Sequence, residues 1–310
     1  MKLIYNPAKI VTLLLFSAIL VFTGCRKEIS GNTADEELAS RASSVADAES
    51  EVIFNEVFDN VMGVSNDVGL AGVGVFGQMS IGSIGDVARI DACPTVTKTH
   101  LSTQNTFPLT IVMDFGTGCT GRDGRVRSGK IITTYTNRLI YPGAKATTTF
   151  KDYKVDSFVV EGTHIISNQS IVSGSTPNNL LTLIWKVEIE GARLNKNNGD
   201  YTEWNSNKTI TQVEGMNTPL IPLDDIYRIE GSANGKVKRN NLLVGWRAEI
   251  TEPLIKKFTC RWIVKGVIKV VRLNQSNNSP WTSTLNYGNG ECNNKAILTI
   301  NGDSKEITLP

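Results

Sequence analysis

The sequence predicts a mainly β protein, a large antiparallel sheet built as a sandwich or a curved meander, preceded by one N-terminal helix. Beyond Gly63, valine, isoleucine and threonine dominate short runs that alternate in polarity, and Asn, Gly, Ser and Pro clusters separate them. Before Gly63, a stretch rich in Ala and Glu contains neither proline nor glycine and repeats apolar residues at near-helical spacing. No second helical stretch of comparable length follows, which disfavours folds that alternate strands with helices.

Residues 1–24 predict a lipoprotein signal peptide. Lys2 and Lys9 precede an apolar run over residues 10–22, and Gly24 leads directly into Cys25. A basic start, a short apolar core and a small residue before the cleavage point are typical of export signals. The apolar run is shorter than the roughly 20 residues that a membrane-spanning helix needs. We therefore expect Cys25 to carry lipid, palmitate included, and to become the new N-terminus; the alternative is an ordinary signal peptide with a chance cysteine.

The rest of the chain divides into a tether over 25–33, a helix over 34–66 and an antiparallel β domain over 67–310. The β domain contains 13 strand candidates, recognised by their alternation and by the turn residues between them. They are 87–98, 107–115, 129–142, 146–153, 155–167, 180–194, 207–214, 225–237, 241–250, 258–273, 281–287, 295–301 and 304–309.

Glycines recur inside these strands, each after an apolar residue and a Glu or Lys. Such a glycine commonly marks a bulge or a sharp bend, so we expect the sheet to curve at these positions. They are Gly162, Gly191, Gly215, Gly231 and Gly266.

Four cysteines follow Cys25: Cys93, Cys119, Cys260 and Cys292. An even number in an exported protein predicts two disulfides. The segments 113–119 and 285–292 look alike, and each follows an earlier cysteine. This likeness predicts two equivalent hairpins, each closed by its own disulfide, and two related halves of the β domain. Four cysteines allow three pairings, so crossed pairing and free thiols stay open.

The second hairpin needs one extra residue if its cysteines are to face each other. On its first strand the apolar positions are even, as at Cys260 and Trp262, whereas on the return strand they are odd, as at Trp281 and Leu285. A bulge near Gly288 would supply the missing residue.

Few residues point to chemistry. The three cations Arg125, Arg127 and Lys130 predict an exposed basic hairpin end, with an anionic ligand as the alternative. With two histidines and no CxxC motif, neither a zinc site nor a Ser-His-Asp triad is expected, and no cofactor is expected. The tryptophans should pack in the core rather than stack sugars. They are Trp185, Trp204, Trp246, Trp262 and Trp281.

Several motifs together carry a resemblance. They are Asp114-Phe115-Gly-x-Gly-Cys119, Asp225-Ile226-Tyr227-x-Ile229-x-Gly231, Cys260-Arg261-Trp262-Ile263-Val264-x-Gly266 and Tyr287-Gly288-x-Gly290-x-Cys292. The chain resembles a family of uncharacterised Gram-negative lipoproteins with an N-terminal helix and a cysteine-bearing β domain, over most of its mature length. The resemblance implies this architecture and supplies no activity or ligand.

The predicted function is that of a lipid-anchored outer-membrane protein that acts as a non-catalytic binding or structural module. Once Lys2 and Lys9 leave with the signal, 30 basic residues balance 30 acidic ones, so no nucleic-acid partner is expected. The expected partners are the membrane, through the lipid, and an extracellular polymer or envelope protein. The alternatives are a periplasmic lipid carrier and a secreted hydrolase. The sequence leaves open whether the domain faces the cell surface or the periplasm.

Overall fold

The computed structural model describes residues 33–64, 67–68, 93–101, 104–121, 123–171, 182–218, 222–273, 275 and 279–310. The predicted signal peptide, Cys25 and nearly all of the tether lie outside the described residues. A compact unit runs from Glu37 to Pro310, so most of the helix belongs to the same unit as the strands.

The helix α2 (Thr33–Gly63) confirms the expected N-terminal helix, although it ends at Gly63 rather than at the expected residue 66. Asp35 and Glu36 lie in its first turn, where acidic side chains interact favourably with the helix dipole. Every residue from Ser50 to Gly63 is buried, whereas the N-terminal half keeps an exposed side. The second half of α2 therefore has no face left for solvent, although it carries several acids.

The strands form one 14-stranded antiparallel sheet, which confirms the expected meander; the sandwich alternative is wrong, because no second sheet is present among the described residues. The order is β1-β2-β4-β5-β6-β7-β8-β9-β10-β11-β12-β13-β14, with β3 paired to β4. The strands are β1 (Thr95–His100), β2 (Leu109–Asp114), β3 (Cys119–Thr120), β4 (Val126–Tyr135), β5 (Lys145–Val155), β6 (Phe158–Asn168), β7 (Ile184–Lys196), β8 (Tyr201–Glu214), β9 (Ile226–Arg239), β10 (Leu242–Lys257), β11 (Ile263–Arg272), β12 (Ser283–Asn289), β13 (Lys295–Ile300) and β14 (Asp303–Thr308), and a short 3-10 helix η2 (Pro222–Asp224) precedes β9.

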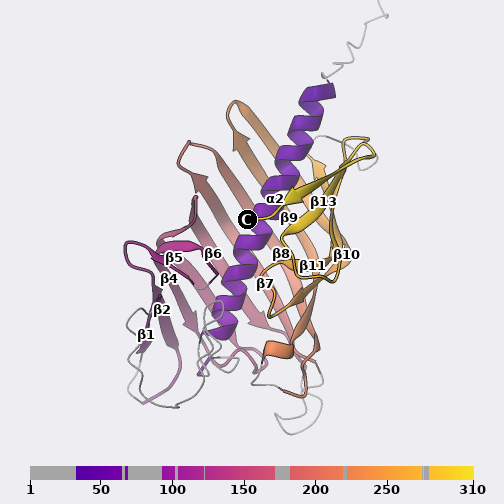
Figure 1. The fold of residues 1–310 in the computed structure, drawn as a ribbon. Helices are drawn as coiled ribbons and strands as arrows, with labels where there is room; N and C mark the ends of the chain where they lie inside the picture. The colour runs from indigo at the N-terminus through magenta and orange to yellow at the C-terminus, as the bar shows by residue number, and fades with distance from the viewer. Residues whose placement is uncertain are drawn as a thin grey trace, which may run out of the picture. The chain divides into compact units, whose positions relative to one another are not determined.

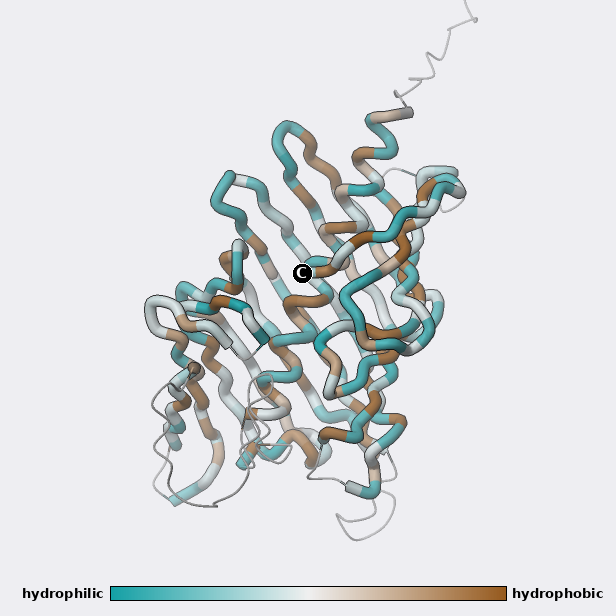
Figure 2. Tube along the Cα trace, in the orientation of Figure 1, coloured by the Kyte–Doolittle hydropathy of each residue, from teal (hydrophilic) through white to brown (hydrophobic). Residues whose placement is uncertain are grey.

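The sheet curves around α2 (Figure 1). From one side, the indole nitrogens of Trp204 in β8 and Trp246 in β10 donate to Asp47 of α2. From another, the hydroxyls of Ser44 in α2 and Ser283 in β12 lie 2.6 Å apart. The strands alternate hydrophilic and hydrophobic residues along their length (Figure 2), and the apolar set faces the helix.

Aromatic side chains fill the space between α2 and the middle strands. Phe54 stacks on Trp204 with ring centroids 5.5 Å apart, and Phe58 meets Tyr227 edge-on at 5.9 Å. Such pairs add to the free energy gained by burying the rings. The core position expected for the tryptophans is confirmed for the three that are almost fully buried, and the other two pack partly buried against the same core. The fully buried ones are Trp185, Trp204 and Trp246.

Four of the five glycines mark bends within strands, as expected, whereas Gly215 lies just after β8 ends at Glu214. All five have positive φ angles, from 58° at Gly191 to 134° at Gly231. A Cβ on Gly231 would lie 2.3 Å from the carbonyl oxygen of Asn207 in β8, and one on Gly162 would lie 2.6 Å from the Cα of Ala192 in β7. Strand registers shift beside the four glycines that lie within strands. At Gly162 and Gly231, glycine permits both the bend and the close approach of the neighbouring backbone.

The two disulfides join Cys93 to Cys119 and Cys260 to Cys292, with Cα–Cα distances of 5.9 and 5.7 Å. The predicted pairing is confirmed. The extra residue expected in the second hairpin is also confirmed. Between the pairs Lys265–Asn289 and Val267–Asn286, the chain advances two residues on β11 and three on β12. That the β domain consists of two related halves stays a prediction.

Candidate functional site

Two buried arginines join the start of β4 to α2. Arg125 and Arg127 are 4% and 1% exposed. The Nε of Arg127 donates to Glu56 Oε1 at 2.7 Å, and Arg125 donates to the other oxygen of the same carboxylate. Arg127 also donates two bonds to Asp123, at 3.0 and 2.6 Å. The expected exposed basic hairpin end is wrong for both arginines, because α2 supplies a buried acid to them; Lys130 alone stays partly exposed.

A second buried group surrounds Asp47, which precedes Glu56 along α2. Asp47 accepts hydrogen bonds from the indole nitrogens of Trp204 at 3.0 Å and Trp246 at 3.2 Å. One turn later, Glu51 forms an ion pair with Lys208 of β8. Burial, reinforced by the charge of Glu51, raises the pKa of Asp47 to about 6.

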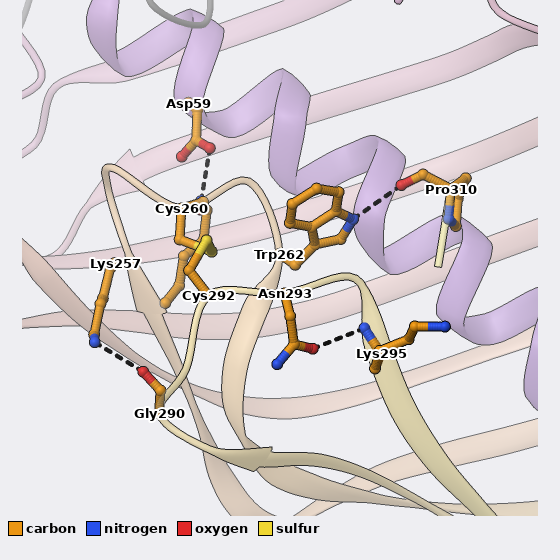
Figure 3. Close-up of a disulfide and its surroundings, with 10 residues drawn as sticks. Asp59, Lys257, Cys260, Trp262, Gly290, Cys292, Asn293, Lys295 and Pro310 are labelled. Atoms are coloured by element: carbon orange, nitrogen blue, oxygen red, sulfur yellow. Dashed lines mark hydrogen bonds and ion pairs between the residues drawn. A yellow bond between two sulfur atoms is a disulfide. The ribbon is translucent and has the colours of Figure 1, made fainter. Parts of the chain in front are cut away.

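A third group lies near the end of α2, beside the second disulfide. The Nζ of Lys256 lies 2.7 Å from Asp59 Oδ2 and donates to the carbonyl oxygen of Cys260 at 2.8 Å. The position of Asp59 above that disulfide is visible in Figure 3. Burial raises the pKa of Asp59 to about 7, although the charge of Lys256 lowers it.

These groups link α2 to the sheet, and their carboxyls are closed to solvent. A raised carboxyl pKa often marks a catalytic acid when the group lies in a cleft. Here Asp47 and Asp59 are 1% and 5% exposed and face side chains of the surrounding sheet. Neither histidine serves as a neighbouring base, because His164 is fully buried, which lowers its pKa to about 3, and His100 lies on the exposed β1 strand.

An open groove lies between the N-terminal half of α2 and the last strand. It has a volume of about 520 Å³ and we name it the α2–β14 groove. Its residues are Arg41, Val45, Ala48 and Glu49 of α2 and the chain from Glu306 to Pro310. Val45 and Ala48 make an apolar floor together with Ile307, whereas Arg41 and Glu306 are exposed charges.

Both walls of the α2–β14 groove are fixed by side chains outside it. Glu49 accepts from Lys196 at 2.9 Å and from Arg239 at 2.8 Å, which ties α2 to the ends of β7 and β9. On the other wall, the indole nitrogen of Trp262 donates to the carbonyl oxygen of Pro310 at 3.0 Å (Figure 3). The disulfide of Cys260 holds the segment that carries Trp262. The groove is thus a preformed site, of the kind that binds ligands with little rearrangement.

A second depression, of about 400 Å³, lies on β9, β10 and β11. Glu249 and Lys269 are directly opposed there across β10 and β11, with Ser232 opposite Glu249 on β9. This depression lies within three strands that are paired on both sides, whereas the α2–β14 groove lies at an edge of the sheet.

The structure does not bring the predicted site residues together in one place. Cys25 lies outside the described residues, and the four other cysteines form the two disulfides. Among the described residues, no cluster of three metal-binding side chains occurs and no helix has the length and apolar character needed to cross a membrane. The groove residues were not predicted. The spacing of Leu38, Val45 and Glu49 places them near one side of α2. Spacing alone does not show which side of a helix the sheet leaves uncovered.

Comparison of the chain with protein-family models, with curated proteins and with solved structures finds no match.

Proposed function

We propose that this protein is a lipid-anchored component of the outer membrane that acts as a non-catalytic binding module, and that the α2–β14 groove is its binding site. The lipid at Cys25 would hold the domain at the membrane, and the groove would take a partner from the cell envelope or an extracellular polymer. The observation that carries the proposal is a preformed groove, apolar at its floor and charged at its rim, at the edge of a sheet whose interior is otherwise filled by α2.

The filled interior favours this function over the two alternatives. A lipid carrier would have to place an acyl chain where α2 now lies, and the inner positions there include the paired charges of Glu51 and Glu56. A hydrolase would need an accessible base, and the carboxyls with raised pKa values, Asp47, Asp59 and Asp225, are buried. Burying an apolar chain against paired charges gains little free energy and leaves polar groups without water.

Site-specific photocrosslinking in intact cells tests the proposal. A photoreactive phenylalanine derivative replaces Val45 in the groove, and in a control it replaces Thr209, which is exposed on the opposite face of β8. We expect a discrete crosslinked product from position 45 and none from position 209. With Cys25→Ala in the same protein, the product should disappear as the protein leaves the membrane fraction.

Equal labelling from positions 45 and 209 would contradict the groove as the site. A Cys25→Ala protein that stays with the membrane would contradict the lipid anchor. Protease treatment of intact cells, with a periplasmic protein as control, then places the groove on the surface side or the periplasmic side.

A further inference from the structure

We infer that the α2–β14 groove binds an extended, acidic peptide segment, which adds a strand to the free edge of β14. This inference rests on the proposed function and names the class of its partner. Main-chain hydrogen bonds would supply affinity, and the side chains that point toward α2 would supply selectivity, as in other cases of strand addition.

The register of the last hairpin determines which backbone groups face the groove. β14 pairs with β13 alone among the described residues. Leu309 N donates to Asn294 O at 2.8 Å, and in an antiparallel pair the residues bonded to the neighbour alternate with residues that face away. Residues 305 and 307 therefore bond toward β13, and Ser304, Glu306 and Thr308 direct their N–H and C=O groups to the free edge.

The groove lies along this free edge. Its wall includes residues of both kinds, Glu306 and Thr308 as well as the inward-facing Ile307. A strand paired with the edge would alternate its own side chains above and below the sheet. The inward set would lie over Val45 and Ala48 of α2, which favours small apolar residues at those positions of the peptide.

The charges of the groove favour an acidic peptide. Glu306 pairs with Lys295 at 3.1 Å, and Glu49 is shared by two cations. Arg41, in contrast, is exposed and has no ion pair among the described residues. An acid on the peptide would pair with Arg41, and a lysine there would meet an uncompensated cation.

A second copy of this chain fits the edge less well. In an antiparallel pairing of two β14 strands, the three residues facing out would pair with their counterparts. Centring the pair on Glu306 sets two carboxylates opposite each other, and shifting it by one residue toward Ser304 sets Lys305 opposite Lys305. Like charges directly opposed across strands are destabilising.

The test removes one backbone N–H that faces the free edge of β14 and leaves the hydrogen bonds between β13 and β14 in place. Glu306→Pro deletes the outward donor, whereas Glu306→Ala deletes the same side chain and keeps the N–H. Proline is tolerated where an edge strand's N–H faces away from its neighbour. The matched control is Val96→Pro at the other free edge, β1, where the bond from Leu101 N to Pro108 O places residue 96 among the outward-facing ones.

The probe is a phage-displayed library of short random peptides, selected on the wild-type protein. We expect enriched peptides in which the side chains facing α2 are small and apolar over Val45 and Ala48 and acidic near Arg41. By fluorescence polarisation, Glu306→Pro should weaken their binding roughly tenfold relative to Glu306→Ala, which corresponds to about 1.4 kcal/mol. Val96→Pro should bind as the wild type does, and all three variants should unfold at similar temperatures. Arg41→Glu should weaken acidic peptides and favour basic ones.

Equal binding by Glu306→Pro and Glu306→Ala would overturn strand addition. So would a failure to enrich any peptide while the crosslink at position 45 persists in cells, in which case the groove binds another class of ligand. If that crosslink is also absent, the proposed function falls with it.

Discussion

At the scale of single residues, the acids of α2 decide how the helix is held. Glu56, Asp47 and Asp59 would suit a solvated helix face, yet each meets a partner on the sheet. A buried pair of charges adds little net stability compared with apolar packing, but removing one member leaves the other uncompensated. These acids therefore specify the position of α2 more than they stabilise the fold.

Glu56→Ala measures this effect. It leaves Arg125 and Arg127 buried without their shared carboxylate, so we expect the free energy of unfolding to fall by about 3–5 kcal/mol. The control is Glu203→Ala, because the pair of Glu203 with Arg193 is exposed and such pairs contribute about 0–1 kcal/mol. Urea denaturation of both variants compares the losses; similar values would show that the Glu56 cluster does not hold the helix.

At the scale of elements, the bends of the strands depend on glycines that serve two purposes. Gly231 has φ of 134° and also lies where a Cβ would contact β8, whereas Gly302, in the last turn, has φ of 86° and open space around it. The two positions therefore separate backbone strain from crowding.

We expect Gly231→Ala to destabilise the protein more than Gly302→Ala. The turn substitution should cost about 1–2 kcal/mol, the usual strain of an L-residue in that region, and the strand substitution should add the cost of pushing β8 away. Thermal unfolding followed by circular dichroism compares them. Equal losses would mean that β8 gives way freely and that the close approach does not set the curvature.

The elements themselves were largely predictable from the sequence. Alternation, turn residues and the strand glycines indicated the meander, and the parity of Cys260 against Trp281 indicated the bulge near Gly288. The site was not predictable. That Arg127 is buried depends on Glu56, which lies 71 residues away in the sequence, and hydrophobic periodicity carries no information about such pairs. The free edge of β14 likewise follows only from the strand order.

At the scale of the whole molecule, the buried carboxyls predict how stability changes with pH. The pKa values of Asp47, Asp59 and Asp225 rise from 3.8 to about 6, 7 and 6, so between these limits the folded protein binds protons that the unfolded chain has released. Their contribution is therefore present at low pH and lost as the pH rises through the folded-state values. His164 acts in the opposite direction, because its pKa falls to about 3 on folding.

Three carboxyls outweigh one histidine, so we expect the free energy of unfolding to fall between about pH 5 and pH 7. Asp59→Asn should make this fall shallower across the whole range, and near pH 7 it should remove most of the fall that remains, because the Asp59 carboxyl titrates highest. Around Asp59 the charged or titratable neighbours are Lys256, Glu56 and Tyr227. Urea denaturation across this range measures the slope in both proteins; an unchanged slope would assign the effect to other groups.

The path of the chain has a consequence for the order in which the protein folds. Each strand pairs with a neighbour close in sequence, so the sheet can grow hairpin by hairpin, and such local steps are fast. The contacts of α2 are of the opposite kind: Ser44 meets Ser283 across 239 residues, and Asp47 meets Trp246 across 199. During synthesis the helix precedes all of its partners, and its acids have no cations to meet until the later strands exist. We therefore expect the enclosure of α2 by the last three strands to be the slow, late step of folding, because these contacts join the residues farthest apart in the sequence.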